Sequence, residues 1–155
     1  MKRDDLQKIL LANFGHLDDR QLLALTIYGE SRGEGREGMI AVGSVILERV
    51  DHRVWDGETI REVCLMPYQF SCYLPSDPNY GGLLLIARNF LPHSEKSISL
   101  LRCYMIAWGL LEDTIPRTPI IAEHHVTQYC TPAVNPTWKQ QMKLVARIGG
   151  HEFYA

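Results

Sequence analysis

The chain has 155 residues, of which 46% are hydrophobic and 22% charged. This is the composition of an ordinary globular protein, so we expect one domain over residues 1–155 and exclude a disordered chain. Sixteen basic and eighteen acidic side chains leave a formal net charge of −2. The sequence contains no concentrated basic block, so a nucleic-acid partner is not expected. Apolar runs are much shorter than the roughly 18 residues of a membrane span, so stable membrane insertion is not expected.

The N-terminus and the cysteines indicate where the chain is made. Asp4 and Asp5 interrupt the basic start, and no small-residue cleavage site follows a long apolar stretch, so no secretory signal peptide is visible. We therefore expect synthesis in the cytoplasm. The four cysteines form no C-x-x-C pair, which predicts reduced thiols, although Cys64 and Cys72 could bridge across the turn at Pro67 in an oxidising compartment.

Two helices are expected at the start of the chain. Apolar residues at helical spacing predict the first over residues 4–14, with Gly15 as its C-terminal stop. Asp18 as the N-cap and Gln21 three residues into the helix predict a capping box. The second helix then runs towards Tyr28.

A polar, glycine-rich segment over residues 29–38 separates the second helix from the third. Helical spacing resumes over residues 37–50, which we interpret as the central helix. Gly43 and Ser44 are small enough to let another helix approach it closely.

The middle of the chain mixes short helices with a long loop. Thr59 and Glu62 predict a capping box for a helix of one or two turns that Pro67 ends. Residues 68–78 mix aromatic, polar and proline residues without periodicity, which is typical of a long ordered loop or the wall of an active site.

Two apolar segments follow this loop. The first comes after Gly81 and Gly82 and ends near Phe90, and the second is a helix that opens at Ser94. We expect one stripe of this helix to lie in the core: Ile98, Leu101, Met105, Trp108 and Leu111.

The C-terminal part favours strands. Residues 120–130 are rich in Ile, Val, Thr and Tyr, which predicts a strand, and residues 145–154 predict a hairpin with a type I′ turn at Gly149 and Gly150. This register sets two pairs opposite each other, Arg147 with Glu152 and Ala146 with Phe153. The expected class is α+β, mostly helical, with a small C-terminal antiparallel sheet.

Glu30 is the strongest candidate for catalysis. It ends an apolar helix, just before Ser31 and the glycine-rich segment. A general acid must stay protonated, and apolar neighbours such as Ile27 and Tyr28, together with the negative end of a helix dipole, favour that state. The alternative is a solvated loop of ion pairs formed by Glu30, Glu34, Glu37, Arg32 and Arg36.

A second set mixes aromatic rings with neutral hydrogen-bonding groups: Gln69, Phe70, Ser71, Cys72, Tyr73, Tyr129, Trp138 and Tyr154. Sugar rings stack on aromatic faces and their hydroxyl groups bind such polar side chains, so this mixture suits a groove for a neutral carbohydrate. Anchoring of long loops by buried rings explains the same composition equally well.

A third set, His124, His125, Cys130 and His151, has the residue types of a zinc site. On a strand, His124 and His125 would point to opposite faces, so only one of them could join the other two. Structural histidines and a buried thiol are the alternative that we prefer, and nothing marks Cys130 as a reactive thiolate.

Four blocks resemble one known family, in the same order. LTIYGESRGEGREGMIAVGSVILERV (residues 25–50) resembles the signature of the spore-cortex-lytic-type cell wall hydrolases, which also occur as bacteriophage and prophage lysins. TIREVC with YQFSC (59–72), VNPTW (134–138) and RIGGHEFY (147–154) are similar to further blocks of that family. The family-like region covers residues 20–155, after an N-terminal helix and lead-in over residues 1–19.

This resemblance implies a lysozyme-like catalytic domain that cleaves peptidoglycan between N-acetylmuramic acid and N-acetylglucosamine. Glu30 matches the first glutamate of the family's Glu-x-Arg-Gly-Glu motif, which is the catalytic acid. Ser31 replaces the family's usual alanine. Gln128, Tyr129 and Cys130 stand where family members commonly carry a His-aromatic-His run, so the role of those histidines does not transfer.

The resemblance favours lytic transglycosylation, in which one glutamate donates a proton and later accepts one, forming 1,6-anhydro-N-acetylmuramic acid without a cofactor or metal. Muramidase-type hydrolysis at the same bond would need a second carboxylate, and Glu34 is the nearest in sequence. A zinc-dependent N-acetylmuramoyl-L-alanine amidase, using the third set, and a non-catalytic glycan-binding module are the remaining alternatives.

We expect nine residues to bind or orient the glycan beside Glu30: Tyr28, Ser31, Glu34, Gln69, Phe70, Ser71, Tyr129, Trp138 and His151. The expected partner is the glycan strand of peptidoglycan, bound by a monomer. A holin pore or a virion is the expected route to the cell wall.

Overall fold

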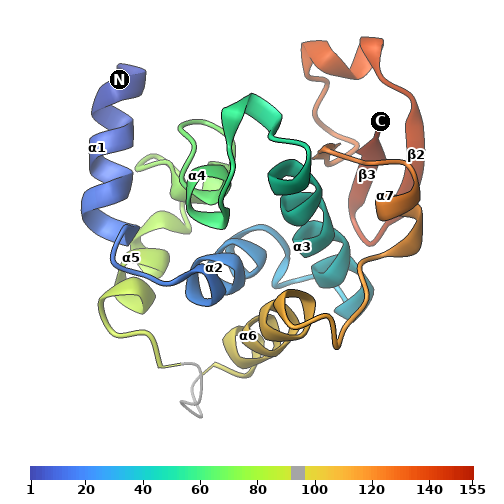
Figure 1. Cartoon of the computed structure of the whole chain (residues 1–155). Coiled ribbons are helices and arrows are strands. Elements are labelled where there is room, and N and C mark those ends of the chain that lie inside the picture. Colours follow the sequence, from blue (N-terminus) through green and yellow to red (C-terminus); the bar gives the residue numbers. More distant parts are fainter. Residues whose placement is uncertain (92–96) are drawn as a thin grey trace.

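The computed structural model describes residues 1–91 and 97–155 and contains a body of helices with a small sheet at one side (Figure 1). The helices are α1 (Arg3–Phe14), α2 (Asp19–Ser31), α3 (Arg36–Asp51), α4 (Ile60–Cys64), α5 (Tyr80–Arg88), α6 (Ile98–Leu111) and α7 (Pro119–Glu123). The strands are β1 (Gln128–Cys130), β2 (Leu144–Ile148) and β3 (His151–Tyr154), and short 3-10 turns cover Val54–Asp56, Ser71–Tyr73 and Thr137–Gln141. The expected α+β class, mostly helical, is confirmed.

The first two helices start and stop as their local signals predict. The Asp18 side chain accepts a hydrogen bond from the Gln21 amide at 2.7 Å, and the Gln21 side chain accepts one from the Asp18 amide at 3.0 Å. Gly15 follows the last residue of α1. Helix α2 continues beyond Tyr28 to Ser31, so the first part of the glycine-rich segment is helical and Glu30 lies in the last turn.

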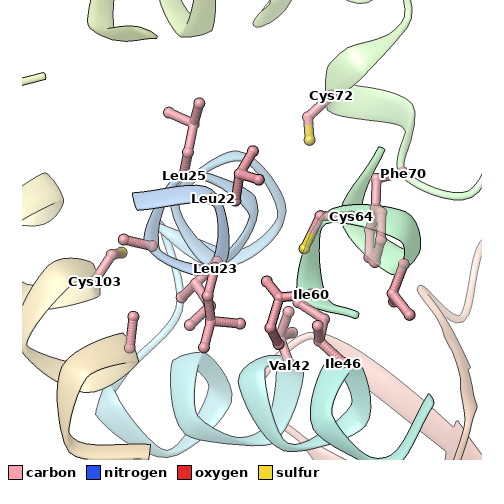
Figure 2. Close-up of a cluster of buried hydrophobic side chains, with 14 of the residues drawn as sticks. Leu22, Leu23, Leu25, Val42, Ile46, Ile60, Cys64, Phe70, Cys72 and Cys103 are labelled. Carbon is pink, nitrogen blue, oxygen red and sulfur yellow. The ribbon is translucent and has the colours of Figure 1, made fainter. Parts of the chain in front are cut away.

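Helices α2, α3, α4 and α6 enclose the main apolar core (Figure 2). The expected close approach at Gly43 is confirmed, since a Cβ atom there would lie 2.5 Å from a methyl carbon of Leu110 on α6. A larger side chain at this position would require the side chains of Leu110 and Ile27 to move. The cysteines are free, and Cys64 and Cys72 are not bridged.

The prediction for the core-facing stripe of α6 is wrong. Ile98, Met105 and Trp108 are 63%, 53% and 43% exposed. The buried face consists of Leu100, Cys103, Ile106, Ala107 and Leu110. Helix α6 is apolar on both faces, so spacing alone could not choose between them. The predicted start at Ser94 lies outside the described residues, and the side chain of Ser97 caps α6 by accepting from the Leu100 amide.

The two shorter helices in the middle of the chain differ in how well they were predicted. The capping box at Thr59 and Glu62 is confirmed, and α4 ends at Cys64, before Pro67. Helix α5 begins at Tyr80, so both of the following glycines lie inside its first turn.

Within the described residues no helix has the length and apolar character needed to cross a membrane.

The predicted strand over residues 120–130 is also wrong over most of its length. Pro119 starts the short helix α7, where its fixed φ suits the first turn. His125 then adopts a left-handed conformation with φ 51°, and only Gln128–Cys130 forms a strand. The apolar residues that suggested a strand, such as Ile121, are instead buried from a helical turn.

The three strands form an antiparallel sheet in the order β1-β3-β2. The predicted pairing of Arg147 with Glu152 and of Ala146 with Phe153 is confirmed. The turn type is not: Gly149 has a positive φ of 56° and Gly150 does not share it, whereas a type I′ turn needs both. A second, smaller core of five buried side chains lies between α3, α7 and the sheet: Ala41, Val45, Ile121, Val126 and Phe153.

Candidate active site

A cavity of about 250 Å³ lies between the ends of α2 and α3, the 54–56 and 68–69 segments and β1. Its lining residues are Glu30, Arg49, Trp55, Tyr68, Gln69, Gln128, Tyr129 and Trp138. Of these described residues Glu30 alone carries a carboxylate. The cavity therefore combines one acid, one guanidinium, two amides and four aromatic rings, which is a mixture suited to an oligosaccharide.

The two carboxylate oxygens of Glu30 have different surroundings. The Tyr129 hydroxyl donates a hydrogen bond to Oε2 at 3.1 Å. Oε1 is buried and has no hydrogen-bond partner in the protein. Burial first, and then the Glu30 carboxylate, raise the pKa of Tyr129 well above its ordinary value. The Tyr129 hydroxyl therefore remains a donor to Oε2, whereas Oε1 is enclosed by the protein without a hydrogen-bond partner.

Gly29 lets the wall behind Glu30 form. A Cβ atom at Gly29 would lie 2.6 Å from Cys72 Sγ, so the 71–73 turn packs directly on the last turn of α2. Burial, followed by the charge of Glu30, raises the pKa of the Cys72 thiol well above its ordinary value. Cys72 is consequently a neutral packing group rather than a nucleophile.

Arg49 is a cavity residue that sequence reasoning missed. Its side chain is only 3% exposed, and its Nε donates to the Thr127 carbonyl at 2.8 Å. Its Nη1 is buried without a partner. Burial lowers the pKa of Arg49, while electrostatic interactions with Tyr129 and Glu30 act in the opposite direction. A signal was available, because a buried helix rarely carries a charged residue such as Arg49 unless it is paired or functional.

Unpartnered buried polar atoms point to this cavity. Among the described residues three buried side-chain atoms lack a hydrogen-bond partner, and two of them, Glu30 Oε1 and Arg49 Nη1, belong to side chains that line it. Buried polar groups are nearly always paired in folded proteins. This concentration of unpaired polar atoms marks the cavity as the candidate site.

Two exposed aromatic residues form the rim, and sequence reasoning gave them no binding role. Trp55 and Tyr68 are 42% and 51% exposed. Both have positive φ angles, 53° and 68°. Residues other than glycine adopt this conformation at a cost of roughly 1–3 kcal/mol, and such strain clusters at ligand sites. Arg49 stacks on the Trp55 ring at 5.0 Å, which connects the rim to the cavity floor.

The predicted binding residues divide into two groups. Gln69, Tyr129 and Trp138 line the cavity together with Glu30. The others lie outside its lining: Ser31 is buried and donates to the Ile27 carbonyl, Tyr28 lies under the Arg32 guanidinium, Phe70 is buried beneath Arg49, and Ser71 is exposed on the 71–73 turn.

Glu34 and His151 connect the helices to the sheet. Glu34 Oε2 accepts a hydrogen bond from the Gly150 amide at 2.8 Å, and His151 Nδ1 lies 3.7 Å from Glu34 Oε1. The His151 ring packs edge-on against Tyr129, with 5.2 Å between ring centres. His151 therefore packs against Tyr129, and Glu34 lies next to His151.

The structure does not bring the predicted zinc set together. His125 lies against Glu48 and His52, whereas His151 lies against Glu34. The Cys130 thiol is near the Val134 carbonyl, and burial raises its pKa. These residues do not form one metal site, so the amidase alternative loses its proposed ligands.

Comparisons with known proteins identify the family and the fold of the chain. The family model described as Cell Wall Hydrolase matches residues 33–154. A spore cortex-lytic enzyme of Oceanobacillus iheyensis is 41% identical over 54 residues, which are 35% of this chain and 19% of that protein. The chain thus matches only about a fifth of the length of this curated relative.

Two solved structures share the fold. The catalytic domain of the germination-specific lytic transglycosylase SleB from Bacillus anthracis has a TM-score of 0.61 at 24% identity, covering 88% of this chain and 93% of that one. The catalytic domain of the Bacillus cereus SleB protein has a TM-score of 0.60 at 25% identity, covering 88% and 89%. The helical body and the C-terminal sheet are therefore similar to those of known catalytic domains.

Proposed function

The chain belongs to the cell wall hydrolase family, and from this membership we propose that it is a lytic transglycosylase of peptidoglycan with Glu30 as its catalytic acid and base. The bond cleaved is the one between N-acetylmuramic acid and N-acetylglucosamine. The observation that carries the proposal is that Glu30 is the single carboxylate among the described residues lining the cavity. The structural relative from Bacillus anthracis is a lytic transglycosylase, which supports the same reaction class.

In the first step Glu30 acts as a general acid. The Tyr129 hydroxyl donates to Oε2, which orients the carboxyl group of Glu30 and the proton that it carries. Glu30 transfers this proton to the glycosidic oxygen while the bond to C1 of the muramic acid breaks and the ring flattens towards an oxocarbenium ion. The N-acetylglucosamine hydroxyl leaves with the proton.

In the second step the same carboxylate acts as a base. Glu30 accepts the proton of the C6 hydroxyl of the muramic acid, and the C6 oxygen forms a bond to C1. The product is the 1,6-anhydro sugar, and Glu30 regains its proton. Hydrolysis would instead need a second carboxylate, about 5–5.5 Å away as a nucleophile or about 6.5–9.5 Å away as a base. Glu34, the nearest in sequence, is bound to the Gly150 amide.

Arg49 and Tyr129 stabilise the ionised form of Glu30 between the two steps. The Tyr129 hydroxyl donates to Oε2, and the positive charge of Arg49 acts on Glu30. Such preorganised donors and charges stabilise the developing carboxylate more strongly in a buried site than in water. Trp55, Tyr68 and Trp138 supply ring faces for the sugars.

We also propose that the enzyme works as a monomer on the glycan strands of the cell wall. A holin pore or a virion would bring a protein of this kind to its substrate. Gln69 and Gln128 then bind hydroxyl or acetamido groups of the glycan, because their amides are the neutral donors and acceptors of the cavity.

Mass analysis of the soluble fragments released from purified peptidoglycan tests the proposal. Wild-type protein should release fragments lighter by one water than reducing-end muropeptides. Glu30→Gln should release none of them, because glutamine can neither donate the proton nor accept it back, while its unfolding temperature stays close to that of wild type.

The matched control is Glu37→Gln, which changes an exposed glutamate in the first turn of α3 and should leave the products unchanged. Fragments with reducing ends would instead mean hydrolysis, and Glu34→Gln would then identify the second carboxylate. Equal release by wild type and Glu30→Gln would refute the assignment of Glu30. Binding of peptidoglycan without any release would favour a non-catalytic module.

A further inference from the structure

Three metal-binding side chains converge on the surface behind the cavity. Glu48 lies in the last turn of α3, His52 follows that helix directly, and His125 follows α7. Glu48 Oε2 lies 3.3 Å from His52 Nε2 and 3.3 Å from His125 Nδ1, and the two histidine nitrogens lie 3.1 Å apart. In the part of the chain that the structure describes, this is the one group of three such ligands within reach of a common ion.

Hydrogen bonds alone do not account well for this arrangement. The three atoms form an almost equilateral triangle, so the two neighbours of each atom lie about 60° apart. An N–H group points in one direction, and hydrogen bonds weaken steeply when the angle at the hydrogen falls below about 120°. Each ring nitrogen can thus serve one neighbour, and the three contacts cannot all be good hydrogen bonds.

The triangle does have the dimensions of one face of a coordination tetrahedron. Zinc binds imidazole nitrogen at about 2.0–2.1 Å and carboxylate oxygen at about 2.0–2.2 Å, which places neighbouring ligand atoms about 3.3–3.4 Å apart. The observed separations are 3.1–3.3 Å. Two histidines and one glutamate are also a known zinc ligand set, and imidazole nitrogen favours zinc over magnesium or calcium.

The surroundings hold the carboxylate in place and favour a cation. Glu48 is 3% exposed, and its other oxygen, Oε1, accepts from Arg117 Nη1 at 2.7 Å. Arg117 also pairs with Asp51 at 2.6 Å. Two carboxylates, those of Glu48 and Asp51, thus surround one guanidinium, which leaves net negative charge beside the two imidazole rings. Hydrogen bonds of this kind orient metal ligands.

We propose that Glu48, His52 and His125 form a zinc site that ties the end of α3 to the segment before β1. Both histidine side chains are partly exposed, at 43% and 65%, so the ion can reach them from solvent. Three protein ligands leave a fourth position for water. The set differs from the one expected from the sequence, since it includes neither Cys130 nor His151.

A bound ion here stabilises the architecture next to the cavity. His125 is two residues from Thr127, whose carbonyl accepts from Arg49, and four residues from Tyr129. Glu48 precedes Arg49 on α3. The zinc site therefore clamps together the two segments that position these cavity groups, and its existence does not depend on the reaction proposed for Glu30.

Zinc titration of the metal-free protein in competition with a chromogenic chelator tests the site directly. Wild type should bind one Zn²⁺ per chain. His52→Gln and His125→Gln should each weaken binding at least about 10-fold, because each removes a ligand. Both side chains are exposed enough for the variants to fold. His124→Gln, at an exposed neighbouring histidine outside the triangle, and Cys130→Ser should bind zinc as wild type does.

Thermal unfolding supplies a readout independent of activity. At zinc about 100-fold above its dissociation constant, the unfolding temperature of wild type should rise by roughly 5–10 °C. His124→Gln should show the same rise, and His52→Gln and His125→Gln should lose it. Tetrahedral visible absorption on loading with Co²⁺ should follow the same pattern.

Three results would overturn the proposal. The first is zinc binding by His52→Gln or His125→Gln with wild-type affinity. The second is loss of binding in Cys130→Ser, which would assign the metal to that thiol. The third is a dissociation constant in wild type weaker than about 1 mM, corresponding to less than about 4 kcal/mol of binding free energy.

Discussion

The helical body (α1 to α6) and the C-terminal sheet (β1, β2 and β3) are held together by different forces. The helical body surrounds a large core in which Leu22, Leu23 and Leu25 are fully buried (Figure 2). The sheet contributes one fully buried apolar ring, Phe153, to a core of only five buried side chains. Glu30 belongs to the helical body and Tyr129 to the sheet, so the candidate site lies where the two regions meet.

Polar contacts replace apolar packing in the C-terminal sheet. The Glu152 carboxylate accepts hydrogen bonds from Lys139 at 2.8 Å, Arg147 at 3.0 Å and Tyr154 at 2.7 Å. Charge-assisted hydrogen bonds of this kind depend on pH and geometry, whereas apolar burial depends mainly on area. Glu30 therefore lies in the region that is stabilised mainly by apolar burial. Its partner Tyr129 lies in the region whose stability depends more on pH.

Truncation in the core should show the largest difference between the two regions. Leu23→Ala removes a fully buried side chain and should lower the free energy of unfolding by about 2–5 kcal/mol. Leu144→Ala, at a partly buried position in β2, should cost less than about 1.5 kcal/mol. Denaturant unfolding followed by circular dichroism measures both, and equal losses would contradict the comparison.

Gly29 should tolerate no side chain, because α2 and the 71–73 turn meet there without a gap. Gly29→Ala places a methyl group against Cys72 and should cost about 1–3 kcal/mol of stability. The rate of peptidoglycan release should fall by more than the loss of folded protein explains, since Glu30 is the next residue. Gly81→Ala, which meets no atom within 4 Å in α5, is the matched control and should be neutral or stabilising. An unperturbed Gly29→Ala protein would mean that the two elements can separate freely.

Tyr129→Phe removes the hydrogen bond that crosses from the sheet to Glu30. We expect kcat for peptidoglycan cleavage to fall roughly 10-fold, equivalent to about 1.4 kcal/mol, with a stability change of about 0.5–1.5 kcal/mol. Tyr80→Phe loses a hydrogen bond with Asn13, away from the cavity, and should keep full activity. If both variants behaved alike, Tyr129 would have no role beyond folding.

The smallest expected difference between the two regions is a pH-dependent contribution of the sheet to stability. Three donors, led by Lys139, lower the pKa of Glu152 to about 2. An unfolded glutamate titrates near pH 4.3, so this contribution is complete above about pH 4.3 and is lost as the pH falls towards 2. Glu152→Gln should therefore unfold with less pH dependence across that range, measured by thermal unfolding. An unchanged slope would show that the network does not stabilise the sheet.

Local signals in the sequence predicted the parts of the fold that depend on neighbouring residues. Both capping boxes, the close approach at Gly43 and the cross-strand pairs of the C-terminal hairpin are confirmed. Glu30 was placed at the end of its helix by the same reasoning. Capping boxes are decided within a few residues and a hairpin register by one turn, and the small side chain of Gly43 permits a close contact whose partner, Leu110, only the packing supplies.

Features that depend on distant contacts were missed or predicted wrongly. The apolar residues of α6 surround the helix, so only its neighbours decided that Trp108 faces outward. The β-branched residues before β1 formed α7 because Pro119 starts a helical turn and Ile121 has a core to fill. Arg49, Trp55 and Tyr68 line the cavity from three segments that only the packing of the elements brings together.

From the sequence alone, the class of fold, two capped helix starts and the pairing of the C-terminal hairpin were predicted correctly, because caps and hairpin pairs form between residues that are close in sequence. The choice of Glu30 as the catalytic carboxylate stays a prediction. Only the tertiary structure decided which groups surround Glu30 and which three ligands meet at Glu48, His52 and His125. The physical reason is that a site of converging side chains exists only when separate elements pack at set distances. Glu48 and His125 are 77 positions apart, so their contact cannot be predicted from local sequence patterns and forms only when the elements pack.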